Sequence, residues 1–525
     1  MLYLLPHILQ QSAERHPQKA ALRFNGQGLT YPELLRRSDR IAWLLQDSGL
    51  KRLDRVGVFL NKSIETVVAI YGIMRAGGVY VPLDPRSPLA RLQFMHRDCG
   101  FRFLITHEPQ QKAVQELVDG EHALTHIFGL PTDSIEGVHT LSWGEIEAVP
   151  DSAPRDQGSM EQDLAYIMYT SGSTGTPKGL MHTHASGLSY ARLSADTYDV
   201  RSEDVVSNHS PLHFDMSTFD YFTSLLQGAT TVIIPEAYTK LPASLSQLIE
   251  SERMTIWYSV PFALIQLLLR GALDKRDLGS LRWVLFGGEP FPPKHLRALM
   301  DLWPHARFSN VYGPAEVNQC TYYHVPTRVD EEESIPIGKV WDNSYGLVLD
   351  EQDCEVQAGE VGELVVRTPT MMRGYWNRPD LNERAFYRRQ LFSNYEEVFY
   401  RTGDLVQALP DGNLKFLGRK DRQVKTRGYR VELDEVESAL YSLPQVEEAA
   451  VFVVPDQEGS QQIYAAAIPK TGESLSEADL KNTMSGLVPW YALPQRILIL
   501  NEFPRTGSGK IDRRRLGLQA QEISL

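Results

Sequence analysis

Short runs of β-branched and aromatic residues alternate with segments of helical periodicity along the first part of the chain. The run RVGVFL at 55–60 is followed by the helix-like segment SIETVVAIYGIMRAGG, in which Ser63 is expected to cap a helix, and then by VYVPLDP. A second series runs from LAYIMYTSG to RFSNVYG, and each of its strand-like runs ends in a turn rich in Gly, Pro or Ser. This alternation predicts an α/β fold with a largely parallel sheet, in which such turns are where ligands bind.

The pattern changes to strands and turns after about Ile335, with YGLVLD and GEVGELVVR as examples. The last hundred residues or so have their own helix, LDEVESALYSL, and two strands, VEEAAVFVVP and QIYAAAIP. We therefore expect a mixed α+β chain overall. A large N-terminal domain (1–420) of α/β subdomains plus a β-rich subdomain is followed by a small, mobile α+β C-terminal domain (421–525).

The stretch TSGSTGTPKG, from Thr170 to Gly179, concentrates glycines, hydroxyls and a lysine after an apolar run. It is not a Walker A loop, because Pro177-Lys178-Gly179 stands where Gly-Lys-Ser/Thr is required. Consecutive backbone N–H groups without bulky side chains still form a concave surface that suits an anion. The residues alone leave two readings, a phosphate site and a flexible polar turn.

Four further stretches follow in order: NVYGPAE, YRTGDL, GRKDRQVKTRGYRVELDEVE and RTGSGKIDR. With the loop at 170–179, they resemble the adenylate-forming superfamily of acyl-CoA synthetases, luciferases and nonribosomal peptide synthetase adenylation domains. VYVPLDP, HFDMSTFDYF and GELVVRTPTMMRGYWNRPDL extend the resemblance over nearly the whole chain. It implies a ligase that converts a carboxylic acid and ATP into an acyl-adenylate and pyrophosphate, and then passes the acyl group to a thiol.

The resemblance also implies a nucleotide site. Tyr312 is expected to stack on adenine, Asp404 to accept the ribose hydroxyls, and Glu316 to help hold Mg²⁺, a hard ion that prefers oxygen ligands. Taken alone, Asp404 would be a turn former and Glu316 a surface ion-pair partner. Ala315 stands where many members have a threonine that contacts the α-phosphate, so that hydrogen bond is in doubt. The residues expected to bind ATP are Thr170, Ser171, Gly172, Ser173, Thr174, Gly175, Lys178, Gly288, Asn310, Tyr312, Gly313, Glu316, Asp404 and Arg419.

Two residues of the C-terminal domain have expected roles, one in catalysis and one as a hinge. By resemblance, Lys510 of GSGK is the catalytic lysine, which bridges the substrate carboxylate and the α-phosphate, although its residue type alone would make it one exposed lysine among many. Asp421 occupies the position of the interdomain hinge about which the C-terminal domain is thought to rotate before thioester formation.

The stretch HFDMSTFDYF bears on the substrate. In amino-acid-activating members the aspartate after phenylalanine pairs with the substrate α-ammonium, and here that residue is Asp215. A buried carboxylate without a cation is costly, although a helix N-cap is the alternative. The expected pocket, completed by Lys510, consists of Phe214, Asp215, Met216, Phe219, Ser259, Leu285, Gly287, Val311, Gln319 and Cys320.

This lining has no charge beyond Asp215 and Lys510, so we expect a small or compact neutral amino acid such as proline, alanine, glycine or serine. The expected acceptor is the phosphopantetheine thiol of a separate carrier protein, because only fifteen residues follow Lys510 and none supplies a carrier domain. Three alternatives stay open: an acyl-CoA synthetase, an inactive nucleotide-binding scaffold, and an enzyme that releases its adenylate to another acceptor.

Composition excludes other classes of function. The net charge of −13 is spread along the chain without a Lys/Arg block, so nucleic acid is not expected as a partner. Three cysteines are too few and too dispersed for a disulfide framework or a zinc knuckle. No apolar stretch approaches the ~20 residues needed to span a bilayer, and the N-terminus resembles a surface helix rather than a signal peptide. We expect a cytoplasmic protein that does not bind membranes.

Overall fold

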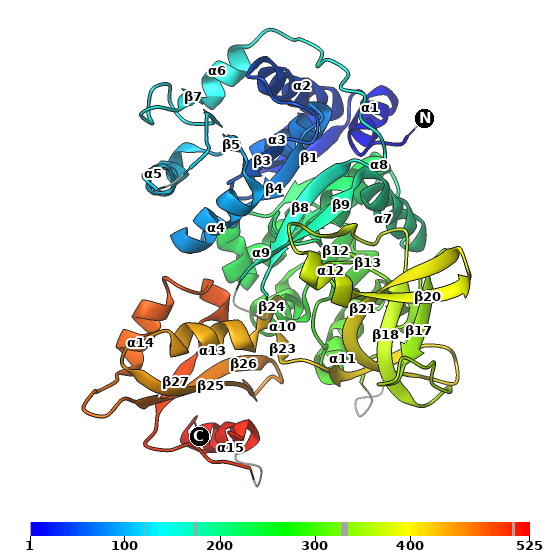
Figure 1. Cartoon of the computed structure of the whole chain (residues 1–525). Coiled ribbons are helices and arrows are strands. Elements are labelled where there is room, and N and C mark those ends of the chain that lie inside the picture. Colours follow the sequence, from blue (N-terminus) through cyan, green and yellow to red (C-terminus); the bar gives the residue numbers. More distant parts are fainter. Residues whose placement is uncertain (1, 121, 173–175, 327–333, 507–509, 525) are drawn as a thin grey trace. The chain divides into compact units, whose positions relative to one another are not determined.

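The computed structural model describes residues 2–120, 122–172, 176–326, 334–506 and 510–524, which form two compact units (Figure 1). Unit 1 comprises Met1–Pro85, His96–Tyr169 and Gly179–Gly418. Unit 2 comprises Arg86–Met95, Thr170–Lys178 and Arg419–Leu525. The chain thus has a mixed α/β fold with a large N-terminal and a small C-terminal part, as the sequence predicts. None of the described helices is both long and apolar enough to cross a membrane.

The first large sheet of unit 1 contains nine strands. In spatial order they are β16 (Lys339–Val340), β15 (Thr321–His324), β14 (Arg307–Tyr312), β13 (Trp283–Gly287), β12 (Ile256–Ser259), β10 (Val205–Asn208), β11 (Thr230–Ile233), β1 (Ala20–Phe24) and β2 (Gln27–Thr30). The strands from β14 to β1 are parallel, whereas β15, β16 and β2 are antiparallel to their neighbours. The first strands of the chain therefore complete a sheet built from its middle.

The second large sheet contains eight strands. In spatial order they are β19 (Gly374–Tyr375), β9 (Lys178–Thr183), β8 (Leu164–Thr170), β4 (Val79–Pro82), β3 (Arg55–Val58), β5 (Phe103–Ile105), β6 (His126–Phe128) and β7 (His139–Leu141). The strands from β8 to β7 pair in parallel. The alternation in the sequence thus corresponds to two largely parallel sheets, and the strands predicted within that alternation lie in one or the other of them.

Helices cover these sheets. Ser63 caps α3 as predicted, because its hydroxyl accepts the N–H of Thr66 at 3.4 Å. Helix α3 has almost all of its residues buried within the largest core cluster, which explains its continuous apolar sequence. The α-helices in this part of the chain are α1 (Pro6–Arg15), α2 (Tyr31–Asp47), α3 (Ile64–Arg75), α4 (Leu89–Cys99), α5 (Gln111–Val118), α6 (Trp143–Ala148), α7 (His184–Thr197), α8 (Ser224–Leu226), α9 (Pro242–Ser251), α10 (Pro261–Arg270), α11 (Pro293–Leu302) and α12 (Pro379–Ala385), with a π-helix at Phe219–Thr223.

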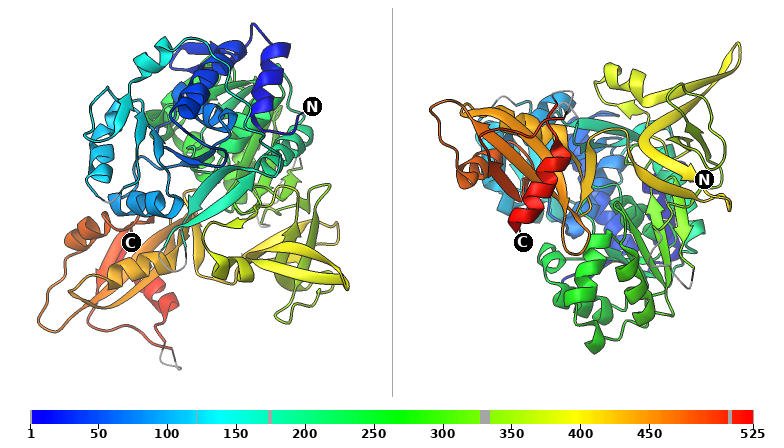
Figure 2. Two further views of the ribbon diagram at one scale, coloured as in Figure 1. Left: turned by 45° about the horizontal axis from the view of Figure 1, so that its top comes forward. Right: turned by 90° about the horizontal axis from the view of Figure 1, so that it is seen from below.

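The β-rich part of unit 1 is a five-stranded sheet. Its strands are β17 (Tyr345–Leu349), β18 (Val361–Arg367), β21 (Tyr395–Ala408), β20 (Phe386–Phe392) and β22 (Leu414–Arg419), and the first four pair antiparallel in this order. The hairpin of β20 and β21 extends outward in Figure 1 and in both views of Figure 2. This sheet confirms the change to strands and turns that the sequence indicates after Ile335.

Unit 2 is built on a three-stranded sheet of β25 (Val446–Pro455), β26 (Gln461–Pro469) and β27 (Arg496–Ile499), next to the hairpin of β23 (Gln423–Thr426) and β24 (Tyr429–Glu432). Alternate residues of β25 enter two cores. Ala449 and Val451 pack with α13 (Leu433–Tyr441) and α14 (Glu477–Met484), whereas Ala450 and Phe452 pack with α15 (Arg513–Ser524), drawn in red in Figure 2. The predicted helix and both predicted strands of this segment are confirmed.

Candidate active site

The carboxyl ends of parallel strands in the nine-stranded sheet gather residues that the sequence assigns to substrate and to nucleotide. Gly287 of β13 is paired with Val311 of β14. The chain then turns back into β15, and the N–H of Cys320 donates to the carbonyl of Tyr312 at 2.9 Å. The expected pocket and the expected adenine site are therefore neighbours at the edge where open α/β sheets bind ligands.

Two glycines at this edge are required by close approach of the backbone. A Cβ atom on Gly287 would lie 2.2 Å from the carbonyl oxygen of Val311, and one on Gly313 would lie 2.4 Å from that of Asn318. Both distances are far inside van der Waals contact, so only glycine fits. The resemblance assigns these glycines to the site, and their local geometry gives a physical reason for the residue type.

Tyr312 and Asp404 are almost completely buried, and the Tyr312 hydroxyl donates a hydrogen bond to the Asp404 carboxylate. The hydroxyl of Thr402 accepts the N–H of Asp404 at 3.1 Å and donates to the carbonyl of Leu364 at 2.7 Å, which fixes the backbone beside the carboxylate. Burial, and then the nearby Asp404, raise the pKa of Tyr312 well above its ordinary value, so the phenol remains a neutral donor.

Glu316 is fully buried, which excludes the reading as a surface ion-pair partner. Its carboxylate accepts a hydrogen bond from the Tyr375 hydroxyl at 2.9 Å, and its carbonyl accepts the N–H of Met372 at 2.7 Å. Among the described residues, no three or more His, Cys, Asp or Glu side chains form a metal cage. One buried carboxylate is the type of protein ligand that suits a Mg²⁺ ion held mainly by phosphates and water.

Asp215 is partly buried just before the π-helix. Its Oδ1 accepts the N–H of Met216 at 3.0 Å, and its carbonyl accepts the N–H of Thr218 at 2.9 Å. The π-helix begins after Thr218 without a side-chain cap, so Asp215 is not its N-cap. Burial first, and the Asp215 charge second, raise the pKa values of Tyr166 and Tyr258, which places neutral phenols near this carboxylate.

The apolar members of the expected pocket belong to one buried cluster. Phe219, Leu285 and Val311 form part of its core, and Met216 packs against it. The rings of Phe219 and Tyr258 meet edge to face at 5.5 Å. The structure thus brings these side chains together from the π-helix, β12, β13 and β14.

The remaining pocket residues have identifiable contacts. Gln319 is buried, and its Nε2 donates to the Tyr198 hydroxyl at 2.8 Å. The hydroxyl of Ser259 accepts from the indole nitrogen of Trp257 at 2.7 Å. The ring of Phe214 lies 5.0 Å from that of His213.

In unit 2, the loop at 170–179 is tied to β24, because the Ser171 hydroxyl donates to the carbonyl of Arg430 at 3.1 Å. A Cβ on Gly172 would lie 2.1 Å from the carbonyl oxygen of Thr176, so the close approach of these two residues requires glycine. Lys178 follows as the first residue of β9. Ser173, Thr174 and Gly175 lie outside the described residues.

Lys510 is exposed at the end of a short hairpin in unit 2. The N–H of Thr506 donates to the carbonyl of Lys510 at 2.8 Å, and Arg505 and Ile511 form an antiparallel bridge. The Arg505 guanidinium also donates to both carboxylate oxygens of Glu448, at 2.7 and 2.8 Å. The backbone at Lys510 and Ile511 is thus paired with Thr506 and Arg505, while the Lys510 side chain is exposed.

Arg419 and Asp421, assigned to nucleotide binding and to the hinge, form a two-point ion pair in unit 2 with distances of 2.6 and 2.7 Å. Burial raises the pKa of Asp421, but the hydrogen bonds and charge of Arg419 outweigh it and hold that pKa below its usual value. The N–H of Gln423 also donates to Asp421 at 3.1 Å. Arg419 is therefore already paired with a carboxylate within its own segment.

The structure adds contacts that the sequence does not predict. Tyr375, which holds Glu316, lies in the quoted stretch RGYWNRPD, but nothing in that stretch points to Glu316. Asn310, expected at the adenine edge, donates through Nδ2 to the carbonyl of Pro336 at 2.8 Å. His182 donates through Nε2 to the carbonyl of Ala315 at 3.0 Å, and burial lowers the His182 pKa to about 4. The polar contact that the structure shows at Ala315 is therefore made by its backbone carbonyl, with His182.

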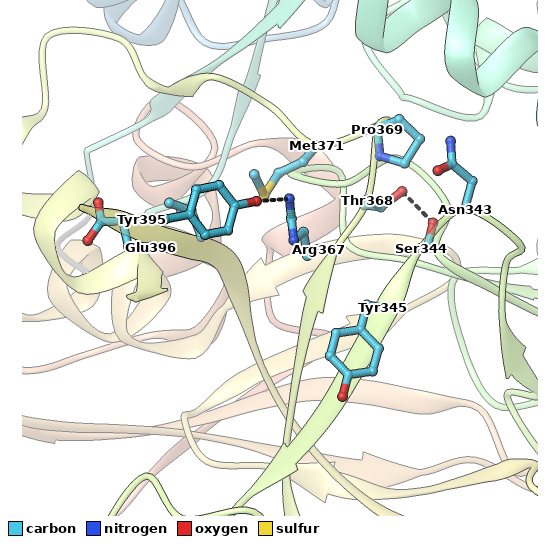
Figure 3. Close-up of a pocket in the computed structure, with 10 residues that line it drawn as sticks. Asn343, Ser344, Tyr345, Arg367, Thr368, Pro369, Met371, Tyr395 and Glu396 are labelled. Atoms are coloured by element: carbon cyan, nitrogen blue, oxygen red, sulfur yellow. Dashed lines mark hydrogen bonds between the residues drawn. The ribbon is translucent and has the colours of Figure 1, made fainter. Parts of the chain in front are cut away.

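A separate cavity of about 730 Å³ lies in the β-rich part of unit 1 and contains none of the predicted site residues (Figure 3). The Arg367 guanidinium donates to the Tyr395 hydroxyl at 3.2 Å, and Ser344 donates to Thr368 at 3.0 Å. Arg367 also forms an ion pair with Glu397, so its charge is compensated. The one Arg or Lys side chain among the described residues that line this cavity, Arg367, is thus already paired with a carboxylate.

Comparison with known families gives two matches. A family model described as AMP-binding enzyme matches residues 9–376, and one described as AMP-binding enzyme C-terminal domain matches residues 435–510. A curated ligase that joins L-proline to an L-prolyl-carrier protein, from Pseudomonas fluorescens, is 34% identical over 520 residues, covering 99% of each chain. A ligase of the same name from Streptomyces coelicolor is 34% identical over 505 residues, covering 94% of this chain and 92% of the relative.

Solved structures show the same fold at lower sequence identity. An amide bond synthetase from Marinactinospora thermotolerans superposes with a TM-score of 0.88 at 22% identity, covering 98% of this chain and 99% of the other. An adenylation domain from Vibrio cholerae in complex with glycyl-adenosine-5'-phosphate superposes with a TM-score of 0.85 at 24% identity, covering 99% and 98%. The arrangement of sheets described above is therefore shared along the full length of these chains.

Proposed function

Because the chain belongs to the AMP-binding enzyme family and is an AMP-forming ligase, we propose that it activates a small or compact neutral amino acid. The first product is the aminoacyl-adenylate, formed with release of pyrophosphate. The aminoacyl group then passes to the phosphopantetheine thiol of a separate carrier protein. Proline, alanine, glycine and serine are the candidate substrates, and two relatives of similar length are proline ligases of this kind.

Asp215 carries the amino-acid assignment. A partly buried carboxylate is best compensated by a cation, and the α-ammonium of an amino acid supplies one. The rest of the pocket is apolar or uncharged, so a charged substrate side chain would be left unpaired.

In the proposed first step, a carboxylate oxygen of the amino acid attacks the α-phosphorus of ATP, and the bond to the pyrophosphate oxygen breaks. The buried pair of Tyr312 and Asp404 is suited to hold the adenosine, with Tyr312 against adenine and Asp404 at the ribose hydroxyls. Glu316 would be the protein ligand of Mg²⁺, which neutralises phosphate charge when bound. Lys178 and the loop before it would hold the β- and γ-phosphates.

Lys510 is proposed to neutralise the charge that develops between the substrate carboxylate and the α-phosphate. A compact ammonium on a flexible stem, carried on an exposed hairpin, can enter a site and leave it. Asp421, close to the start of the main segment of unit 2, is proposed as the hinge that lets the thiol replace the lysine. The proposed setting is the cytoplasm, where ATP and a carrier protein meet.

The decisive experiment is ATP–pyrophosphate exchange against a panel of amino acids and simple carboxylic acids. We expect exchange with small neutral amino acids and its loss in Asp215→Asn, because the neutral amide no longer pairs with the α-ammonium. Asp411→Asn, in an exposed turn, is the matched control. Exchange with fatty or aryl acids alone would make the protein an acyl-CoA synthetase instead.

Incubation with radiolabelled amino acid and either a carrier protein or CoA then tests the acceptor. Label on the carrier protein supports the proposal. Label on CoA alone contradicts the carrier step while leaving the adenylation step intact, and no exchange with any acid would favour the scaffold alternative.

A further inference from the structure

Several buried polar atoms in and beside the apolar cluster lack a hydrogen-bond partner among the described residues, and three of them belong to side chains close to expected pocket residues. These three are the hydroxyl of Tyr190, the indole nitrogen of Trp341 and the amide oxygen of Gln319. Tyr190 and Trp341 belong to the same buried cluster as Phe219 and Val311. Buried polar atoms in folded proteins are nearly always paired, so unpaired atoms on neighbouring side chains point to a partner outside the chain.

Tyr190 and Trp341 reach this place from different elements. Helix α7, which carries Tyr190, packs on the π-helix that carries Phe219, and the hydroxyls of Ser194 and Thr223 are hydrogen bonded at 2.8 Å between them. The rings of Tyr190 and Trp341 lie 6.0 Å apart. Both side chains therefore pack in the cluster that contains residues expected to line the substrate pocket.

The position after β16 gives Trp341 a second link to the pocket. The backbone N–H of Trp341 donates to the carbonyl of Cys320 at 3.0 Å, and Cys320 is a predicted pocket residue. The adjacent Gln319 is fixed in orientation, because its Nε2 donates to the Tyr198 hydroxyl at 2.8 Å and to the carbonyl of Thr321 at 3.4 Å. Only the NH₂ group can donate to a carbonyl, so the unpaired atom of this side chain is its oxygen, an acceptor.

The three unpaired atoms define a complementary group. An indole nitrogen can only donate, an amide oxygen can only accept, and a phenol can do either. A partner that satisfies all three must accept one hydrogen bond and donate another. A hydroxyl does both in the smallest volume, whereas a methyl group or a pyrrolidine ring does neither.

The charge of the neighbourhood agrees with an uncharged partner. Asp220, next to Phe219, is fully buried, and its Oδ2 accepts from Asn208 at 2.8 Å. Burial raises the pKa of Asp220 well above its ordinary value, and the hydrogen bond from Asn208 and the charge of Lys62 only partly oppose this. Burial therefore favours the uncharged form of Asp220, which provides no counter-charge for a cationic side chain.

We propose that the amino acid activated by this protein carries a side-chain hydroxyl, as serine and threonine do, bound by Tyr190, Trp341 and Gln319. The inference rests on the proposed function, since it assumes that an amino acid occupies the pocket beside Asp215. It makes Tyr190 and Trp341 specificity-determining residues, and it ranks serine above proline, alanine and glycine among the proposed substrates.

The test is kcat/KM in ATP–pyrophosphate exchange of the full chain with serine, threonine, alanine, valine and proline. We expect serine or threonine to exceed alanine and valine by about 100-fold or more, because a site built to bond a hydroxyl leaves polar atoms unpaired with the apolar analogue. Tyr190→Phe and Trp341→Phe should each reduce this preference by about tenfold. Trp283→Phe is the matched control, because Trp283 is also a buried indole without a partner among the described residues but lies at the opposite end of β13 from Gly287.

Thermal unfolding of each variant distinguishes lost recognition from lost folding. The inference would be overturned if kcat/KM were highest with alanine, valine or proline. It would also be overturned if both Tyr190→Phe and Trp341→Phe kept the full preference for a hydroxyl. Neither result would contradict amino-acid activation. Absence of exchange with every amino acid would instead overturn the proposed function, and the inference with it.

Discussion

The two units contain proposed site residues of opposite character. In unit 1, Tyr312, Glu316 and Asp404 are almost fully buried, and each is held by a hydrogen bond to another side chain. In unit 2, Lys510 is exposed on a hairpin, and the Arg419–Asp421 pair lies at the start of the main segment. Groups that bind a nucleotide gain from a rigid, dry setting, whereas a group that must arrive for one step and leave for the next gains from an exposed one.

The two units also differ in their histidine content. All fourteen belong to unit 1, and unit 2 has none. Burial lowers the pKa of His182 and His184 to about 4 and that of His209 to about 3. Unit 1 thus contains buried imidazoles held neutral in addition to its ion pairs, such as Arg52–Asp163, whereas unit 2 has ion pairs such as those of Glu437 with Arg422 and Arg513 and no histidine.

Replacing Lys510 should give the largest effect. In Lys510→Ala we expect pyrophosphate exchange to fall by about 10²–10³-fold, because a positioned cation at the developing charge is lost. Transfer to the carrier from supplied aminoacyl-adenylate should largely survive, and the unfolding temperature should not change, because the side chain is exposed. Lys470→Ala, another exposed lysine of unit 2, is the control. Equal loss of both steps would show that Lys510 does not act in adenylation alone.

Restricting the backbone at Asp421 should separate the two half-reactions. In Asp421→Pro we expect exchange to stay within about threefold and thioester formation to fall by about 10–100-fold, since proline fixes φ and removes a donor at a position that must rotate. Single-turnover loading of the carrier measures the second step. Asp421→Asn, which keeps an acceptor for the Gln423 N–H, is the control. Normal loading in Asp421→Pro would exclude a hinge here.

Replacing Asp404 should weaken the binding of ATP more than the binding of the amino acid. In Asp404→Asn we expect kcat/KM for ATP to fall by about tenfold, because hydrogen bonds to a charged acceptor are weakened while the Tyr312 contact is kept. The KM for the amino acid should stay near its original value. A rise confined to the amino-acid KM would place Asp404 outside the ribose site.

Mild acid should destabilise unit 1 before unit 2. The folded-state pKa values of the buried histidines lie below the unfolded value of about 6.5, so their stabilisation is complete above that pH and is lost as the pH falls towards 4. Each of these histidines contributes a loss of about 1.4 kcal/mol in the free energy of unfolding per pH unit in this window. In unit 2, burial raises the pKa of Glu437, but Arg422, the Val451 N–H and Arg513 outweigh burial and lower that pKa. The stabilisation of unit 2 by the charged Glu437 therefore persists to below about pH 4.3, the ordinary pKa of a glutamate.

Hydrogen exchange of the intact protein at pH 7 and pH 5, corrected for intrinsic rates, measures both units at once. Peptides from 179–418 should lose protection first. Equal losses, or earlier loss in 419–525, would contradict the contrast in how the two units are stabilised.

Local elements were predictable from sequence, because their determinants lie within a few residues. Ser63 marks a helix start, and the runs VEEAAVFVVP and QIYAAAIP coincide with β25 and all but one residue of β26. The family resemblance also placed Asp404 and Tyr312 in one site, and the structure shows them hydrogen bonded.

Contacts between distant segments were not predictable. Nothing in the local pattern indicates that Tyr375 holds Glu316, or that Tyr190 and Trp341 lie beside the pocket, because these pairings depend on how whole sheets and helices pack. The π-helix at Phe219–Thr223 was also missed, since its sequence reads as an ordinary helix and the extra residue per turn is imposed by packing.

The strand order of the nine-stranded sheet determines how long the first strands wait for their partner during synthesis on the ribosome. Strands β1 and β2 end at Thr30, yet β1 pairs with β11, which begins at Thr230. At about 5–20 residues per second, the nascent hairpin waits roughly 10–40 seconds for its neighbour. Throughout that time the open edge of β1 can pair with other nascent chains, so slower translation or crowded polysomes should reduce the soluble yield.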